Sequence, residues 1–140
     1  MEASYCLDTD VLVDLLRGRE PSVSAVRALE DSLAELATTA ITAFELYYGA
    51  LKSAKVQENL NAVRVLLDRL EVIELDEGVA ELAARHLKRL ESRGQAIELA
   101  DLSIGCAALS RGMILVTWNV EHFRRIEGLR VMTPRETLRT

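Results

Sequence analysis

The chain has 140 residues, of which 49% are hydrophobic and 28% are charged, and this is the composition of a globular protein large enough to bury a core. A net charge of −5 argues against non-specific binding of duplex nucleic acid through a broad basic face, although it is compatible with a local basic patch. No apolar run reaches membrane-spanning length, and Met1–Ser4 does not resemble a secretion signal. We therefore expect one domain over residues 1–140, located in the cytoplasm.

Short apolar runs alternate with helical patterns along the chain. Runs bounded by turn residues predict five strands, at Ser4–Leu7, Leu36–Ala40, Val72–Leu75, Ile114–Thr117 and Leu129–Met132. Apolar residues at helical spacing predict helices that begin near Asp8, Ser22, Thr42, Val56, Asp76 and Glu98, with short helical turns after Asn119 and at Pro134. This alternation is typical of an α/β fold in which a roughly five-stranded parallel sheet is covered by helices on both faces.

The two cysteines are interpreted as small buried apolar residues. Cys6 lies on the first predicted strand and Cys106 lies in an apolar helix. Because there is no cluster of histidines near them, we predict neither a disulfide nor a zinc site.

Polar residues follow two of the predicted strands. Binding sites in parallel sheets lie beyond the carboxyl ends of the strands, near the point where strand order reverses. Asp8 follows the first strand and Asn119 follows the fourth, so we expect both side chains at one edge, where Thr117 could add a hydroxyl. Each also has a structural alternative, because Asp and Asn are common helix caps. Asp10 and Asp14 are interpreted as a cap and a solvated residue.

Glu45 lies near the start of a predicted helix, and two interpretations of it stay open. The segment Thr42–Glu45 has the pattern of a capping box, and Ile41 with Leu46 would form the accompanying hydrophobic staple. In the second interpretation, the carboxylate belongs to a functional site. The two roles are compatible because a carboxylate has two oxygens.

Asp101 interrupts a predicted helix that is apolar on nearly every side, so we expect it to be largely buried. Aspartate is rarely buried without a partner, and this indicates a functional role. Gly105, one turn later, would leave room for a ligand beside the carboxylate. Glu98 lies three residues earlier on the same face, either as a supporting acid or as a first-turn residue favoured by the helix dipole.

The histidines and most basic residues receive structural interpretations. His86 and His122 adjoin apolar residues and are interpreted as packing histidines. The basic residues are interpreted as solvated, with the alternative that a few hold phosphate beside an acidic pocket. They gather in two places, with Arg85, Lys88, Arg89 and Arg93 on one helix and Arg124 and Arg125 beyond Asn119.

If the strand ends meet, Asp8, Glu45 and Asp101 become neighbours. Carboxylates that are crowded together repel one another, and some stay protonated unless a cation joins them. The pattern therefore predicts a metal-dependent enzyme.

Four short segments of the chain, taken in order, resemble the segments of a known family. They are Leu7–Leu12 (LDTDVL), Thr42–Gly49 (TAFELYYG), Ala100–Ala107 (ADLSIGCA) and Leu115–Phe123 (LVTWNVEHF). Each segment is weak evidence alone, but the ordered set covers nearly the whole chain and resembles the PIN-domain family. Within that family it resembles the VapC-type toxins of prokaryotic toxin–antitoxin pairs.

The resemblance implies a Rossmann-like, three-layer fold and a ribonuclease that depends on Mg²⁺ or Mn²⁺. It also implies a homodimer and a cognate VapB-type antitoxin whose tail occupies the active site. By position, Asp8, Glu45 and Asp101 match the three acids of the family. Asn119 falls where many members carry a fourth acid, and an amide there adds no negative charge.

The expected reaction is hydrolysis of an RNA phosphodiester bond with help from the metal. Asp8 and Asp101 are expected to anchor the ion. Glu45 is expected to join them as a metal ligand and to orient water or accept its proton. Asn119 is the fourth expected catalytic residue and would steady the metal shell or the phosphate. The expected substrate-binding or supporting residues are Thr117, Thr9 and Glu98.

Two other functions are considered. A PIN-like module that binds RNA or protein without cutting would use the acids only as caps. A phospho-acceptor receiver domain would need a phosphorylatable Asp after the third strand, which Asp76 could imitate, and a lysine after the last strand. No suitable lysine follows Val131-Met132.

Overall fold

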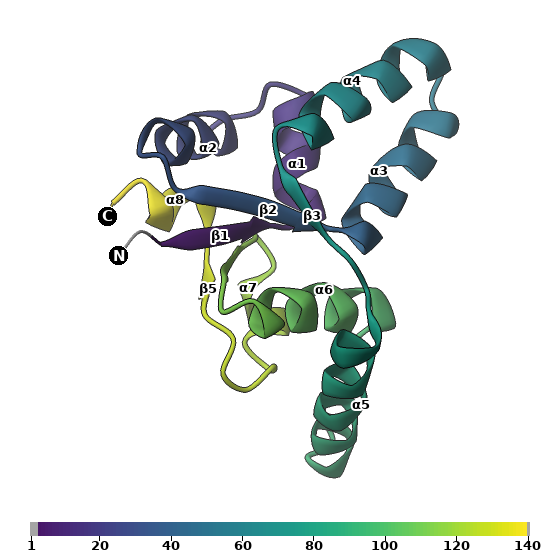
Figure 1. The fold of residues 1–140 in the computed structure, drawn as a ribbon, viewed down its shortest axis with the longest axis vertical. Helices are drawn as coiled ribbons and strands as arrows, with labels where there is room; N and C mark the ends of the chain where they lie inside the picture. Colours follow the sequence, from purple (N-terminus) through teal and green to yellow (C-terminus); the bar gives the residue numbers. More distant parts are fainter. Residues whose placement is uncertain (1–2, 140) are drawn as a thin grey trace.

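The computed structural model describes residues 3–139 and contains a five-stranded parallel sheet (Figure 1). The strands are β1 (Ser4–Leu7), β2 (Glu35–Thr39), β3 (Glu71–Ile73), β4 (Ile114–Val116) and β5 (Val131–Met132). Every pairing is parallel, and the spatial order is β3-β2-β1-β4-β5. This confirms the predicted fold class. The order differs from the 2-1-3-4-5 order of receiver-like sheets, so that alternative is rejected.

The order of the strands also locates the point where a site can form. The chain proceeds from β1 outward to β2 and β3, and then returns to the other side of β1 to form β4 and β5. The carboxyl ends of β1 and β4 therefore flank the reversal of strand order, which is where crevices open in such sheets.

Helices connect the strands at nearly the predicted positions. Their bounds are α1 (Thr9–Leu16), α2 (Ser22–Asp31), α3 (Ala40–Leu51), α4 (Val56–Asp68), α5 (Glu77–Ser92), α6 (Leu99–Ser110), α7 (Val120–Phe123) and α8 (Pro134–Thr137). Asp76 caps α5, as predicted, by accepting a hydrogen bond from the Val79 N–H at 2.9 Å. Among the described residues, no helix has both the length and the apolarity needed to cross a bilayer.

The start of α3 differs from the prediction. Thr39 is the N-cap, and its hydroxyl accepts a hydrogen bond from the Thr42 N–H at 3.1 Å. Thr42 therefore lies in the first turn, and the predicted capping box with Glu45 is wrong. The helix begins earlier because β2 ends at Thr39, so the carboxylate of Glu45 is free for another contact.

Successive side chains of the strands point to opposite faces of the sheet and build two cores. Tyr5 and Leu7 join one core with residues of α1, α2, α3 and α4, whereas Cys6 joins the other with residues of α5, α6 and α7. Figure 1 shows these two groups of helices on opposite sides of the strands, which gives the three layers. Cys6 and Cys106 are free and fully buried, as predicted.

The predicted absence of a secretion signal depends on the first residues of the chain. Met1 and Glu2 lie outside the described residues, so the absence of a secretion signal stays a prediction.

The role predicted for Gly105 is wrong, and a second helical glycine, Gly49, has the opposite surroundings. A Cβ on Gly105 would collide with Ile126 Cδ1 and lie 3.3 Å from atoms of Leu129 and Phe123. Gly105 therefore lets α6 pack against the segment after α7, and it does not leave room for a ligand. A Cβ on Gly49, in α3, would have no neighbour within 4 Å, so Gly49 is not a close-packing site.

Gly105→Ala and Gly49→Ala are expected to change stability in opposite directions. Overpacking at Gly105 lowers the free energy of unfolding by about 1–3 kcal/mol, whereas Gly49→Ala raises it by about 0.5–1 kcal/mol because alanine favours the helix. Urea unfolding of the two variants and the wild type measures both effects. Equal effects of the two substitutions would contradict this assignment.

Candidate active site

Asp8 lies at the end of β1 and links two parts of the chain. Its side chain is 5% exposed. Oδ1 accepts a hydrogen bond from the Thr9 N–H at 2.8 Å, so Asp8 is the N-cap of α1. Oδ2 accepts a hydrogen bond from the Thr117 hydroxyl at 2.7 Å, which ties β1 to the end of β4. The cap interpretation of Asp8 is therefore confirmed, and its role in a functional site is compatible with the cap and stays a prediction.

Glu45 reaches this edge of the sheet from α3. The Thr9 hydroxyl donates a hydrogen bond to Glu45 Oε1 at 2.7 Å and lies 3.0 Å from Thr42 Oγ1. Thr9 thus follows Asp8 in the chain and holds Glu45 through its side chain. The predicted supporting role of Thr9 is compatible with this contact and stays a prediction.

Asp101 lies in the first turn of α6 and completes the acidic group. Burial raises the pKa of its carboxyl, and the nearby charges of Glu98 and Glu45 raise the pKa further. Asp101 in turn raises the pKa of Asp8. The three predicted acids therefore share one electrostatic environment. Asp101 is half-buried, less than predicted, because it lies in the first turn of α6, where Glu98 and Leu99 are exposed.

Asn119 and His122 lie together beyond β4. Asn119 donates its backbone N–H to Thr117 Oγ1 at 3.0 Å, and its Nδ2 is 2.7 Å from His122 Nδ1. His122 is exposed, and its charge lowers the pKa of Asp101. The packing interpretation is therefore wrong for His122, whereas His86 is buried as predicted. The spacing of three residues between Asn119 and His122 on one helical turn is the signal that could have linked them.

Asp10 and Asp14 were also misinterpreted. Asp10 Oδ2 accepts hydrogen bonds from the Trp118 N–H at 3.0 Å and the Thr117 hydroxyl at 3.3 Å. Asp14 Oδ2 accepts hydrogen bonds from Trp118 Nε1 at 3.0 Å and the Ser22 hydroxyl at 2.7 Å. Neither is a cap or simply solvated, because both fasten the segment after β4 to α1. Two acids four residues apart on one helix face were the available signal.

Glu98 lies at the rim of the site. It is exposed and occupies the N-cap position of α6, where its side chain makes no capping hydrogen bond. Its charge raises the pKa of Asp101, so it adds to the negative potential.

The electrostatics of the site favour a bound cation. Burial raises the pKa of Asp8 to about 7, and the charges of Asp10 and Asp101 add to the shift, while hydrogen bonds from Thr117 and Thr9 oppose it. Burial also raises the pKa of Asp10, whose Oδ1 is buried without a hydrogen-bond partner. The ion pairs found within residues 3–139 involve none of these carboxylates.

The donor set fits a hydrated hard cation better than an enclosed site. In the part of the chain that the structure describes, no three Asp, Glu, His or Cys side chains converge closely enough to cage an ion. Mg²⁺ does not need such a cage, because it keeps several waters and is held by one or two carboxylates. Asp8 and Asp101 are the carboxylates that would serve in this way, and their role as ligands stays a prediction.

Known proteins share both the sequence pattern and the fold. A profile of the PIN domain matches residues 5–129. The chain aligns with a crystal structure of DNA-bound VapBC from Salmonella typhimurium at a TM-score of 0.85 and 29% identity, over 94% of this chain and 98% of that one. It aligns with VapBC2 from Rickettsia felis, bound to a DNA fragment from its promoter, at a TM-score of 0.84 and 28% identity, over 92% and 97%.

Full-length relatives give the finer classification. The chain is 32% identical over 126 residues to Ribonuclease VapC1 of Haemophilus influenzae (strain R2866), covering 89% of this chain and 93% of that protein. It is 29% identical over 126 residues to the tRNA(fMet)-specific endonuclease VapC of Shigella flexneri, covering 90% and 94%. The chain therefore belongs to the PIN-domain family, among its VapC-type proteins.

Proposed function

We propose that this chain is a metal-dependent ribonuclease, the toxin of a toxin–antitoxin pair, and that it hydrolyses RNA phosphodiester bonds at the edge of the sheet. The observation that carries the proposal is the electrostatic interaction of Asp101 with both Asp8 and Glu45, in an environment that raises the pKa of Asp8 and of Asp101. Relatives named ribonuclease and endonuclease support the reaction class.

Each residue of the site has a separate role in the proposed reaction. Asp8 and Asp101 would hold Mg²⁺ or Mn²⁺, which acts as a Lewis acid on the phosphate and lowers the pKa of water. Glu45 is held through Oε1 by Thr9, so Oε2 can accept the proton of the attacking water. Thr117 fixes Asp8, and the amide of Asn119 orients the phosphate or water beside them.

The partners and location follow from the same proposal. Relatives solved as VapBC complexes support a VapB-type antitoxin as the protein partner, and the names of the curated relatives support RNA as the substrate. We also propose a homodimer in the cytoplasm. Co-purification with the product of a neighbouring short gene tests the partner, and light scattering of the purified chain tests the dimer.

Removal of the metal tests the reaction itself. The purified chain is incubated with a panel of transfer and ribosomal RNAs in millimolar Mg²⁺, in excess EDTA, and in EDTA followed by Mn²⁺. We expect cleavage only when a divalent ion is present. Undiminished cleavage in EDTA would contradict the proposal, and RNA binding without cleavage under every condition would instead support a non-catalytic module.

A further inference from the structure

We infer that three arginines beyond the acidic group bind phosphates of the RNA strand next to the bond that is cut. They are Arg89 in α5, Arg93 at the C-terminal end of α5 and Arg125 after α7, and we call them the arginine strip. The inference rests on the proposed function, because it names the contact that holds the flanking strand while one phosphodiester lies at the acids.

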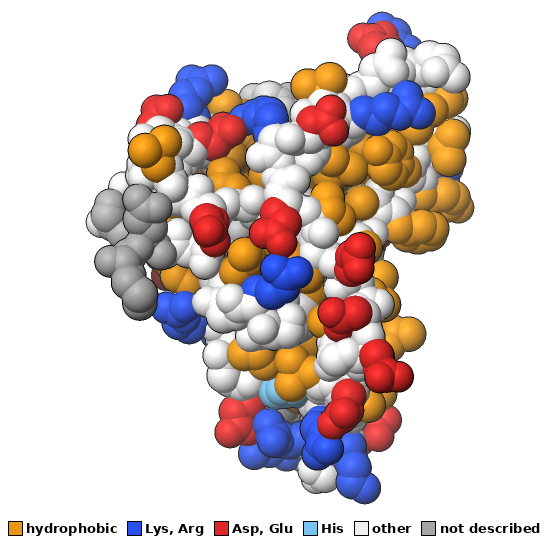
Figure 2. Space-filling view, in the orientation of Figure 1, with side chains coloured by type: hydrophobic (Ala, Val, Ile, Leu, Met, Phe, Trp, Pro, Cys, Tyr) orange, Lys and Arg blue, Asp and Glu red, His pale blue; other side chains and the backbone are white. Residues whose placement is uncertain are grey.

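The strip carries more positive charge than the carboxylate between its members neutralises. Glu127 Oε2 lies 3.0 Å from Arg89 Nη1 and 3.8 Å from Arg93 Nη2, so two guanidinium groups share one carboxylate oxygen. Figure 2 shows Lys and Arg side chains gathered at the lower end of the view, where Figure 1 places the C-terminal end of α5. All three side chains are about half exposed, and ion pairs this exposed contribute little to stability. A phosphate can therefore take the place of Glu127, because guanidinium groups bind phosphate oxygens in pairs.

The strip begins immediately outside the acidic group. The Arg125 guanidinium donates a hydrogen bond to the Ala96 carbonyl, and the Arg125 N–H donates one to the His122 carbonyl at 3.2 Å. Ala96 lies two residues before Glu98, so their Cα atoms are at most about 7 Å apart. Glu98 raises the pKa of Asp101, whereas His122 lowers it, so both lie beside that acid. Arg125 therefore connects the acidic group to the segment that leads back to α5.

The other two arginines extend the strip away from the acids. Arg93 is the C-cap of α5 and lies three residues before Ala96 in the chain. Arg89 lies four residues before Arg93, and residues at this spacing share one face of a helix. An RNA strand with one phosphate at the acids can therefore continue over Arg125 and then over Arg93 and Arg89.

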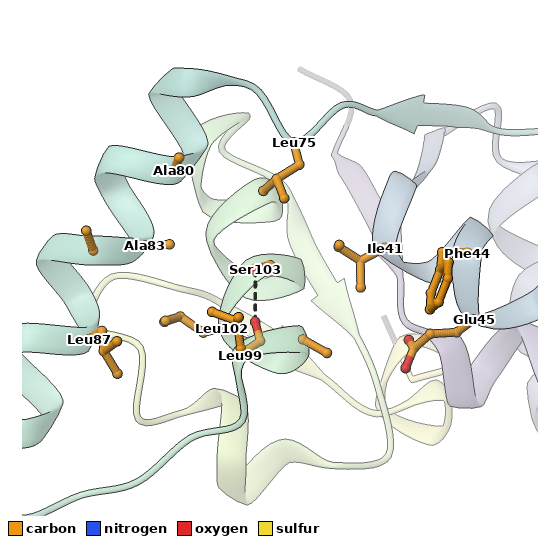
Figure 3. A pocket seen from close by; sticks show the side chains of 12 residues that line it. Ile41, Phe44, Glu45, Leu75, Ala80, Ala83, Leu87, Leu99, Leu102 and Ser103 are labelled. Carbon is orange, nitrogen blue, oxygen red and sulfur yellow. Dashed lines mark hydrogen bonds between the residues drawn. The ribbon is translucent and has the colours of Figure 1, made fainter.

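The strip lies on a different face of α5 from the apolar cavity. Figure 3 shows Ala80, Ala83 and Leu87 on the α5 wall of this cavity, whose volume is about 530 Å³ and whose other walls are α3 and α6. None of the described residues that line it is Lys or Arg. Leu87 and Arg89 are two positions apart, so they project in directions about 200° apart around the helix. A protein partner that covers the cavity would therefore leave the strip open to RNA.

The charge of the chain explains why such a strip is needed. At a net charge of −5, the protein repels a polyanion over most of its surface. A divalent ion at the acids would neutralise only the phosphate that is attacked, and the neighbouring phosphates would still meet negative charge. The arginine strip supplies positive charge where those phosphates lie, so we assign it to an RNA strand in preference to an acidic peptide.

Substitutions of single arginines test the inference. Arg89→Gln and Arg93→Gln are made in an Asp101→Asn background, so that RNA is bound without being cut. Fluorescence anisotropy with a labelled, short, single-stranded RNA measures the affinity at a series of salt concentrations. We expect each substitution to weaken binding about threefold to tenfold and to reduce the slope of log affinity against log salt by about 0.7. An affinity and a slope equal to those of the parent would overturn the inference.

Removal of the shared carboxylate is expected to have the opposite effect. Glu127→Gln releases Arg89 and Arg93 from the carboxylate, so RNA should bind about threefold more tightly in the same background. Unchanged or weaker binding would contradict the competition between this carboxylate and phosphate.

A second ion pair provides matched controls. Arg69 Nε donates a hydrogen bond to Glu30 Oε2 at 3.2 Å. This pair joins the C-terminal ends of α4 and α2, which lead into β3 and β2, so it lies at the edge of the sheet opposite the acids. Arg69→Gln and Glu30→Gln change the net charge by the same amounts and are expected to leave RNA binding unchanged. Equal effects at the two pairs would show that affinity follows net charge alone, and would overturn the inference.

Kinetics with Asp101 intact distinguish this inference from the proposed function. Arg93→Gln is expected to raise KM about threefold to tenfold with little change in kcat, because the flanking phosphates are held equally in the ground state and the transition state. If the wild type cuts no RNA but binding still depends on the arginine strip, the proposed function fails and the strip stands. If the wild type cuts RNA and Arg93→Gln has the same KM, the reverse holds.

An acidic segment of a protein partner is the competing occupant of the strip. The probe is the product of the neighbouring short gene, co-purified with each variant. A weaker complex in Arg93→Gln, together with unchanged RNA affinity, would assign the strip to that partner and overturn the inference. An unchanged complex together with weaker RNA binding would support it.

Discussion

Asp101→Asn is expected to abolish RNA cleavage while leaving the fold intact. The substitution removes one of the two carboxylates proposed to hold the ion, and we expect a loss of about a hundredfold or more in the cleavage rate. The fold should survive because Asp101 is half-buried and its environment raises its pKa, so a neutral amide of the same shape is tolerated. Single-turnover cleavage and a thermal melt measure the two effects.

A matched substitution keeps this prediction specific. Asp68→Asn makes the same chemical change at an exposed position on α4, away from the edge of the sheet that carries the site. We expect the rate and the melting temperature of Asp68→Asn to equal those of the wild type. Wild-type cleavage by Asp101→Asn would remove Asp101 from the reaction.

Asp8→Asn is expected to stabilise the metal-free protein above pH 7. The pKa of Asp8 rises from its usual 3.8 to about 7 on folding, so the native state favours the neutral carboxyl. The resulting stability is fully present below pH 3.8 and is lost as the pH rises through about 7. The amide of asparagine cannot ionise, so Asp8→Asn does not lose this stability. Above pH 7, its melting temperature is expected to exceed that of the wild type by about 5 °C.

Divalent ions are expected to reverse the order of the two melting temperatures, so that the wild type melts above Asp8→Asn. A cation favours the charged carboxylate, so Mg²⁺ should raise the melting temperature of the wild type, increasingly as the pH passes 7, and should have little effect on Asp8→Asn. Thermal melts across pH, with EDTA or with Mg²⁺, test both parts. The difference in melting temperature between the two proteins removes the contributions of titrating groups that both proteins share, such as His86. A wild type that is more stable than Asp8→Asn in EDTA above pH 7 would show that Asp8 is not a buried, destabilised acid.

The residues that follow the strands could be predicted because the local sequence determines where each strand ends. Asp8 follows an apolar run, and the rule that parallel strands end at one edge was enough to bring it near Asn119. Asp101 could be proposed as a site residue because an acid within an apolar helix is rarely buried without a partner. In both cases the evidence lay within a few residues of the acid.

The contacts that were missed depend on distant parts of the chain. Asp10 and Asp14 bind Trp118 and Thr117, more than a hundred residues away, and no local pattern reveals such partners. His122 was misinterpreted because its apolar neighbours in sequence do not surround it in space. Gly105 was misinterpreted because its neighbours are side chains of a segment that packs on α6 only after folding.

The central claim is that oxygen atoms from distant segments hold one divalent ion. Crystals of the protein grown or soaked in millimolar Mn²⁺ test it most directly, through the anomalous signal of the metal. We predict an anomalous peak within ligand distance of the carboxylate oxygens of Asp8 and Asp101. The expected metal–oxygen distance is close to the value for Mg²⁺, about 2.0–2.1 Å. The absence of a peak between these two carboxylates, or a peak that persists unchanged in Asp8→Asn, would contradict the claim.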